Sequence, residues 1–249
     1  MRILGLDTSI SVASVAISEG GRLVAEDFYP RKGSTERSTE GFGVKSNHAE
    51  IILPLVDSVL RRAGIELSDV AGIAVSIGPG SFTGVRIGLS TVKGLAYGTG
   101  MPAVGISTLQ AIAARVAGFE GRVCPILDAR KGEVYAAVFR IHGSQLERLT
   151  QDALMPFLIF LEELRGLGKP APYLFIGDGV TTYRPVLERV PDLQIYVADE
   201  QAMSSVAASI ALLSERQFTD HRAVRLEDLT PVYLRRPECE SRMKLTLSS

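Results

Sequence analysis

The chain has 249 residues, of which 46% are hydrophobic and 22% charged, and its formal net charge is −1. This composition excludes a mainly disordered chain and can build one large or two modest domains, while the even charge balance argues against a surface devoted to nucleic acid. The two cysteines, Cys124 and Cys239, are too few for a disulfide scaffold and suit a reducing cytoplasm. No apolar stretch reaches the ~18 residues of a membrane span, so we expect no membrane contact.

Alternating apolar patterns predict a three-stranded antiparallel meander at the start of the chain, with strands at 2–7, 11–18 and 22–29. The polar stretch 31–46 is predicted to be a solvated loop. The pattern then alternates helix and strand, with helices at 48–63, 81–97 and 107–117 and strands at 71–77 and 102–106.

The second half repeats the opening pattern. Residues 124–128 resemble residues 3–7, and in both cases a second strand starts five residues after the aspartate, at an offset of 121 residues (128 − 7). Later segments are predicted as strands at 123–128, 133–141, 173–176 and 194–197 and as helices at 156–167, 182–189 and 202–216. An internal duplication explains this pattern, and so does coincidence, because strand–turn–strand units are common. A duplication predicts two lobes, at 1–112 and 113–235, followed by a polar tail at 236–249.

Three acidic turns are candidates for a phosphate or hydrated-metal site. They are Asp7-Thr8-Ser9, Asp128, and Gly177-Asp178-Gly179. Carboxylates at strand ends that face one cleft are typical of the nucleotide site of actin, sugar kinases and Hsp70. The alternative is that Asp and Gly only build turns here.

The glycine-rich segment 78–86 lies between a predicted strand and a predicted helix. Its free N–H groups could bind an anion, with Arg86 one turn further on, although the spacing matches neither a P-loop nor a dinucleotide-binding motif. The helix contains Gly84, Gly88, Gly94 and Gly98, and each glycine costs a helix up to ~1 kcal/mol. Close packing against another helix would explain them.

The helix 48–63 carries apolar residues over more than one face, which favours either a helix buried within its lobe or a partner interface. The residues predicted for such an interface are His48, Ile51, Ile52, Leu55, Val56, Val59, Gly84, Val85, Gly88 and Val92.

Metal and hydrolase motifs are missing from the sequence. The three histidines are not spaced as a metal pair, there is no cysteine cluster, and no GxSxG segment is present. We therefore expect no metal site within this chain.

Several segments together resemble the bacterial TsaB (YeaZ) family over nearly the whole chain. The most specific is Ala74–Gly88 with Lys93–Ala96, which contains GPGSFTG; the others are Ile3–Ser9, Asn47–Pro54, Leu127–Tyr135 and Pro231–Arg235. The loop at 31–46 is longer than is usual in that family.

The resemblance implies an α/β fold of two tandem RNase H-like, actin-like (ASKHA) lobes, each a mixed sheet flanked by helices. It implies a non-catalytic subunit of the machinery that places threonylcarbamoyl on N6 of adenosine 37 in tRNA. The partner would be TsaD, bound through the helices of the first lobe, and the TsaE ATPase would dock on that pair. A homodimer would form when TsaD is absent, and tRNA would be contacted mainly through the complex.

The same resemblance places Thr108 and Ile112 where TsaD carries the two histidines of a metal-binding HxxxH pair, and neither residue can replace an imidazole. No cofactor is then required by this chain, although ATP or ADP could bind in the complex. One rival is an active actin-fold ATPase or phosphotransferase that uses Asp7, Asp128 and Asp178. Another is a metallopeptidase of the "glycoprotease" type, which the missing histidine pair disfavours.

Overall fold

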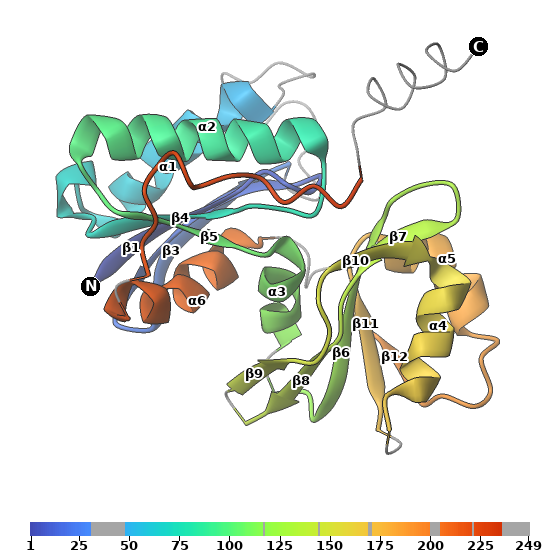
Figure 1. Cartoon of the computed structure of the whole chain (residues 1–249). Helices are drawn as coiled ribbons and strands as arrows, with labels where there is room; N and C mark the ends of the chain where they lie inside the picture. The colour runs from blue at the N-terminus through green and yellow to red at the C-terminus, as the bar shows by residue number, and fades with distance from the viewer. Residues whose placement is uncertain are drawn as a thin grey trace, which may run out of the picture.

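The computed structural model describes residues 1–30, 48–116, 118–143, 145–168, 171–199, 205–220 and 222–235. The predicted loop at 31–46 and the predicted tail at 236–249 lie outside these residues. Two lobes stand side by side, each built on its own β-sheet (Figure 1). In the described part of the chain, no helix is long and apolar enough to cross a membrane.

The two sheets have the same strand order, as a duplication predicts. The first is β3-β2-β1-β4-β5, and the main path of the second is β10-β7-β6-β11-β12. In each sheet the first hairpin is antiparallel and the next two strands join in parallel, so β6 corresponds to β1. The strands of the first sheet are β1 (Arg2–Asp7), β2 (Ala13–Glu19), β3 (Arg22–Tyr29), β4 (Gly72–Ser76) and β5 (Ala103–Ile106). Those of the second path are β6 (Gly121–Asp128), β7 (Glu133–Ala136), β10 (Ala153–Pro156), β11 (Tyr173–Ile176) and β12 (Ile195–Val197).

The single strand predicted at 133–141 is wrong. The chain forms β7 and then β8 (Phe139–His142), which pair with opposite ends of β6, and β8 continues into a hairpin with β9 (Gln145–Arg148). Residues 137 and 138 are buried between the two strands. The apolar pattern of the sequence therefore continues across the break and does not reveal it. The strands β9 and β10 were not predicted.

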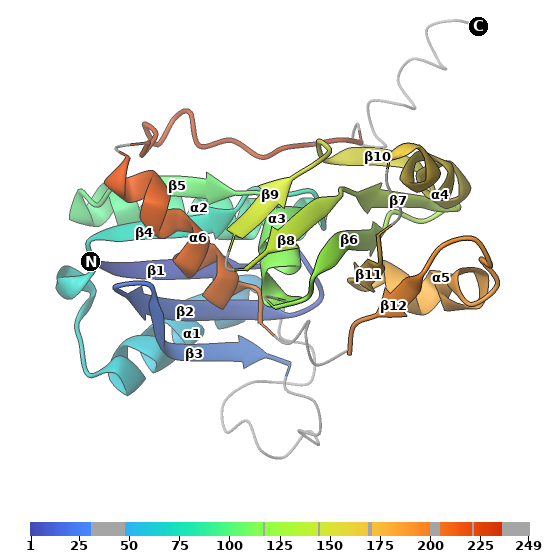
Figure 2. The same cartoon turned by 90° about the horizontal axis from the view of Figure 1, so that it is seen from below.

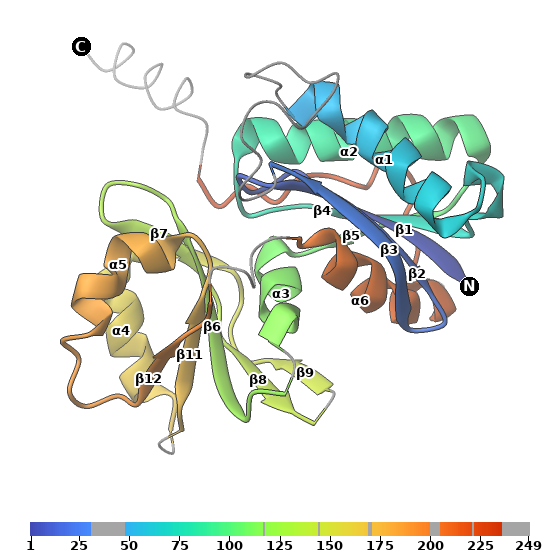
Figure 3. The ribbon, with the colours of Figure 1, turned by 180° about the vertical axis from the view of Figure 1, so that it is seen from behind.

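Helices α1 (His48–Ala63) and α2 (Phe82–Thr99) cover one face of the first sheet (Figures 1 and 3). Ser81 caps α2 by accepting a hydrogen bond from the backbone N–H of Gly84, and Gly100, at φ 73°, ends the helix in the left-handed conformation. On the second lobe, α4 (Phe157–Gly166) and α5 (Gly179–Leu187) cover the outer face of the sheet.

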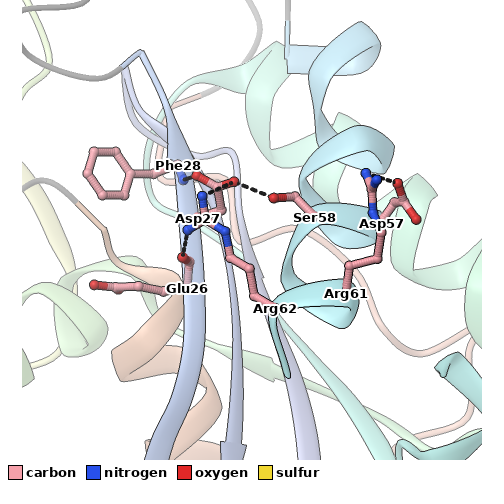
Figure 4. Close-up of polar contacts among 7 residues, drawn as sticks. All are labelled: Glu26, Asp27, Phe28, Asp57, Ser58, Arg61 and Arg62. Carbon is pink, nitrogen blue, oxygen red and sulfur yellow. Dashed lines mark hydrogen bonds and ion pairs between the residues drawn. The ribbon is translucent and has the colours of Figure 1, made fainter. Parts of the chain in front are cut away.

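Polar contacts fix α1 to the edge strand β3 (Figure 4). The carboxylate of Asp27 is buried and accepts a 2.6 Å hydrogen bond from the hydroxyl of Ser58. Arg62 lies 3.5 Å from the same carboxylate and donates to the carbonyl of Glu26. This anchoring sets the rotation of α1, which buries its apolar face on the sheet.

The second lobe was predicted to span 113–235, and this extent needs correction, because the last described helix packs on the first lobe. Helix α6 (Ala207–Thr219) packs on β1, β2 and β4, on the face opposite α1 and α2 (Figure 2). Gly5 permits this approach, since a methyl group at its Cα would lie 2.5 Å from the Ala207 carbonyl oxygen. Residues 222–235 also run along the first lobe. The pattern of an amphipathic helix cannot tell which of two sheets it will cover.

Helix α3 (Thr108–Ala113) lies with α6 between the two sheets. One apolar cluster joins residues of both lobes there, including Val104, Leu109, Ile112, Val123, Phe139 and Ile210. The predicted break at 112 therefore falls inside a helix that belongs to the contact between the lobes.

Candidate functional site

A cleft of about 540 Å³ separates the two lobes. It is lined by residues 9–11, 48, 80–83, 127–130, 135 and 178. Of the three predicted acidic turns, Asp128, Asp178 and Ser9 reach this cleft, whereas Asp7 and Thr8 are fully buried behind it.

Asp7 forms a closed network at the end of β1. Its Oδ1 accepts hydrogen bonds from the backbone N–H of Ser9 (3.0 Å), the hydroxyl of Ser9 (2.6 Å) and the hydroxyl of Ser76. Its Oδ2 is buried without a partner among the described residues. Burial raises the pKa of the Asp7 carboxyl above its usual range, although the hydrogen bonds from Ser76 and Ser9 oppose the shift.

This burial bears on the Mg²⁺–nucleotide that actin-like folds bind. A hydrated Mg²⁺ needs a carboxylate that water can reach, because it keeps several of its waters when bound. Asp7 has no exposed surface, and the hydroxyls of Ser9 and Ser76 already occupy its Oδ1. Asp7 therefore presents no solvent-exposed carboxylate oxygen to such an ion.

The glycine-rich loop before α2 packs directly on the β1–β2 turn. The backbone N–H of Ser81 donates to the carbonyl of Ser9 at 2.7 Å, so this group is not free for an anion. A methyl group at Gly84 would overlap the carbonyl oxygen of Thr8, and one at Gly88 would lie 2.6 Å from the hydroxyl of Thr8. These two glycines let α2 pack against the chain's own turn.

Arg86 does not face the cleft as the anion partner that the sequence suggested. Its guanidinium lies 3.8 Å above the ring of Phe82 and donates through Nε to the hydroxyl of Tyr233 at 2.7 Å.

The second lobe contributes Asp128 and Asp178 to the cleft. The Oδ1 of Asp128 accepts the N–H of Arg130 at 2.8 Å, which repeats the Asp7–Ser9 contact of the first lobe. Asp178 in turn accepts the N–H of Asp128 at 3.0 Å. Desolvation and then the charge of Asp128 raise the pKa of Asp178. Both carboxylates thus stabilise the turn that joins β6 to β7 by accepting backbone hydrogen bonds from it.

Close backbone packing explains why glycine occupies positions 177 and 179. Gly177 has φ 121°, and a methyl group there would overlap the carbonyl oxygen of Ile126. A methyl group at Gly179 would lie 3.1 Å from the same oxygen. The Gly-Asp-Gly turn therefore sits against the end of β6, where only glycine fits closely.

Apart from His48, the predicted interface residues lie inside the first lobe and not on its surface. Ile51, Ile52, Leu55, Val56 and Val59 are at most 7% exposed and pack into the same core as β1, β2 and β4. Gly84, Val85, Gly88 and Val92 are buried as well, and His48 is half-buried, with its ring 3.2 Å from the Thr8 carbonyl oxygen. The broad apolar stripe of α1 thus covers its own sheet and α2.

A different set of side chains forms the outer surface of these helices, named here the α1–α2 face. It consists of Ala49, Leu53 and Pro54 of α1 and Thr83, Arg86, Ile87, Ser90, Thr91, Gly94, Tyr97 and Gly98 of α2, all exposed or half-buried. Those of α2 recur at helical spacing. A groove of about 390 Å³ runs between the two helices at one end of this face.

Gly94 and Gly98 differ from the two buried glycines. Apart from the adjacent residues and the backbone of α2 itself, no heavy atom of the described chain lies within 4 Å of a methyl group placed at either position, and Tyr97 beside them is 87% exposed. No pattern in the sequence separates this pair from Gly84 and Gly88, because which side of the helix is covered depends on the tertiary packing.

Thr108 and Ile112, the positions compared with a histidine pair, are both fully buried in α3. The hydroxyl of Thr108 donates to that of Ser9 at 3.1 Å and so belongs to the Asp7 network. Within the described ranges, no group of three or more His, Cys, Asp or Glu side chains could hold a metal ion.

These features define a two-lobed α/β protein with the actin-like (ASKHA) fold. Component A of (R)-2-hydroxyglutaryl-CoA dehydratase from Acidaminococcus fermentans shares this fold, with a TM-score of 0.51 at 12% identity over 88% of this chain and 99% of that chain. A much closer match is YeaZ from Pseudomonas aeruginosa, with a TM-score of 0.72 at 28% identity over 94% of this chain and 99% of that chain.

Sequence comparison gives the family. A protein named TsaB from Escherichia coli is 31% identical over 94% of this chain and 95% of its own length, and one from Bacillus subtilis is 29% identical over 97% of each. The family model described as TsaD, tRNA N6-adenosine threonylcarbamoyltransferase, matches residues 39–240. The chain belongs to the TsaB family of tRNA threonylcarbamoyladenosine biosynthesis proteins, within the wider group that includes TsaD.

Proposed function

We propose that this chain is a non-catalytic subunit that binds and activates TsaD in the complex that transfers threonylcarbamoyl to N6 of adenosine 37 in tRNA. TsaD would dock on the α1–α2 face, and the pair would help to recruit the ATPase TsaE. The chain would self-associate through the same face when TsaD is absent, and tRNA would be held mainly by the complex.

The observation that carries this proposal is the pair Gly94 and Gly98. Glycine inside a helix destabilises it by roughly 0.5–1 kcal/mol relative to alanine. No other element of the described chain packs against either residue, so this cost has no compensation from packing within the lobe. A helix of a partner that lies against this stripe of small residues could approach the α2 backbone closely and supply the compensation.

Neighbouring side chains support the same assignment. Tyr97 is 87% exposed and Leu53 is 52% exposed, and both lie on this face. An exposed aromatic side chain beside a stripe of small residues suits a protein interface, in which aromatic residues are enriched. The groove bordered by Phe82, Ile87 and Thr91 extends the face toward the start of α1.

The cleft supports a role without catalysis in this chain. The Asp7 carboxylate is closed off from solvent, and those of Asp128 and Asp178 bind backbone N–H groups. We infer that no cofactor is needed by this chain and that any ATP or ADP acts elsewhere in the complex.

Equilibrium binding to purified TsaD tests the interface. We expect Gly94→Leu and Gly98→Leu each to weaken association at least ~10-fold, which corresponds to about 1.4 kcal/mol, because each side chain would separate the two helices. Gly166→Leu is the matched control, since Gly166 ends a helix of the other lobe and also has open space around it. Equal affinity for the two face variants and the control would contradict the assigned surface.

A further inference from the structure

The last described segment crosses from one lobe to the other. Residues 222–235, named here the C-terminal strap, leave α6 and run along the first lobe toward β7 and β10 (Figures 1 and 2). The strap includes Pro231–Arg235, a segment to which neither the cleft nor the α1–α2 face assigns a role.

The first part of the strap is anchored on the first lobe. The N–H of Val224 donates to the carbonyl of Ala103 at 3.1 Å and extends the edge of β5 by one bridge. Leu229 is 3% exposed and packs into the core of the first lobe. The N–H of Val232 then donates to the carbonyl of Ile77 at 2.8 Å, where the chain leaves β4.

The strap next contacts the first turn of α2. The ring of Tyr233 stacks on that of Phe82 with 4.8 Å between centroids, and its hydroxyl accepts the Nε–H of Arg86 at 2.7 Å. Arg86 also lies over the Phe82 ring, so one aromatic pair and one cation form a single cluster. Phe82 borders both the interlobe cleft and the groove of the α1–α2 face.

Two residues further on, the strap reaches the second lobe. Arg235 forms an ion pair with Glu133 at the start of β7, and both side chains are about two-thirds buried, with 28% and 34% exposed. The backbone of Glu133 closes the β6–β7 turn, because its N–H donates to Arg130 and its carbonyl accepts from Ala129. Arg130 and Ala129 line the cleft.

We propose that the C-terminal strap is an interlobe clamp. Tyr233 contacts one wall of the cleft and Arg235 contacts the other, so the strap, together with the apolar cluster around α3, limits how far the lobes open and connects the start of α2 to the second lobe. This inference concerns the isolated chain and does not depend on TsaD binding.

Distances between spin labels on the two lobes test the clamp. Ser11→Cys and Thr181→Cys place labels at exposed positions of the first and second lobes, while Cys239→Ser removes the second native cysteine and Cys124 is buried. We expect one narrow distance population in this background. Arg235→Ala and Tyr233→Ala should each add a population at longer distance.

Two matched variants sharpen the test. Arg225→Ala removes an exposed strap arginine whose ion pairs among the described residues, with Glu227 and Asp228, lie within the strap, and it should leave the distances unchanged. Glu133→Arg should widen the distribution, and combining it with Arg235→Glu should restore the narrow population by reversing the pair. A wild-type distribution in both Arg235→Ala and Tyr233→Ala, or equal widening in Arg225→Ala, would overturn the proposal.

Discussion

The same substitution at two glycines of α2 should change stability in opposite directions. Gly84 faces the β1–β2 turn, where a methyl group would overlap the Thr8 carbonyl oxygen, whereas a methyl group at Gly94 meets no described atom within 4 Å beyond the adjacent residues and the backbone of α2 itself. Gly84 also accepts a 2.7 Å hydrogen bond from the Thr8 hydroxyl through its carbonyl. Alanine at 84 must therefore move α2 away from the turn, and alanine at 94 moves nothing.

The magnitudes follow from these contacts. Overpacking costs about 1–3 kcal/mol and a weakened hydrogen bond about 0.5–1.5 kcal/mol, while the gain in helix propensity returns up to ~1 kcal/mol. Gly84→Ala should thus lower the free energy of unfolding by about 2 kcal/mol. Gly94→Ala receives only the propensity gain and should raise it by about 0.5–1 kcal/mol.

Thermal and urea unfolding of the isolated chain measure both effects. For a chain of this size 1 kcal/mol shifts Tm by roughly 2–4 °C, so Gly84→Ala should melt about 4–8 °C lower and Gly94→Ala about 1–4 °C higher than the wild type. Shifts of the same sign in both variants would refute the distinction between buried and exposed glycines. They would also remove the main support for the α1–α2 face.

Further predictions concern Asp7, Asp27 and the cleft. Burial raises the folded-state pKa of Asp7, so the contribution of its carboxyl to stability is largest below the unfolded pKa near 3.8 and falls as pH rises through the folded pKa. The stability loss in Asp7→Asn should therefore shrink between pH 4 and pH 7. A loss that does not change with pH in urea titrations would contradict this. Ser58→Ala removes a hydrogen bond to the buried Asp27 carboxylate and should cost about 1.5–3 kcal/mol by urea unfolding, whereas an unchanged midpoint would show that Arg62 suffices. Purified chain with Mg-ATP should show no phosphate release; release that disappears in Asp7→Ala would favour the ATPase instead.

Much of the fold could be predicted from sequence because its elements are marked locally. Ser81 and Ser107, where two helices were predicted to start, cap α2 and α3. The repeat of Asp7 at Asp128 is seen in the equivalent hydrogen bond that each carboxylate accepts from the backbone N–H two residues ahead. The break between β7 and β8 was not predictable, since buried residues 137 and 138 continue the apolar pattern.

The candidate surface could be predicted only to the level of the helices. The sequence indicated that α1 and α2 contain more apolar and small residues than one surface needs, but it assigned Leu55 and Gly88 to the partner when both pack within the lobe. Likewise, an aspartate at a strand end looks the same in sequence whether it is buried, as Asp7 is, or exposed, as Asp128 is. Burial depends on contacts between segments distant in sequence, such as Ser76 with Asp7.

The most direct test of the proposed function is reconstituted threonylcarbamoyl transfer to tRNA with purified TsaD, TsaE and this chain. We expect transfer to require the chain, to be lost with the combined Gly94→Leu and Gly98→Leu variant, and to persist with Gly166→Leu and with Asp128→Asn. Full activity with the combined face variant, or transfer by this chain without TsaD, would contradict the account of a non-catalytic subunit that acts through the α1–α2 face.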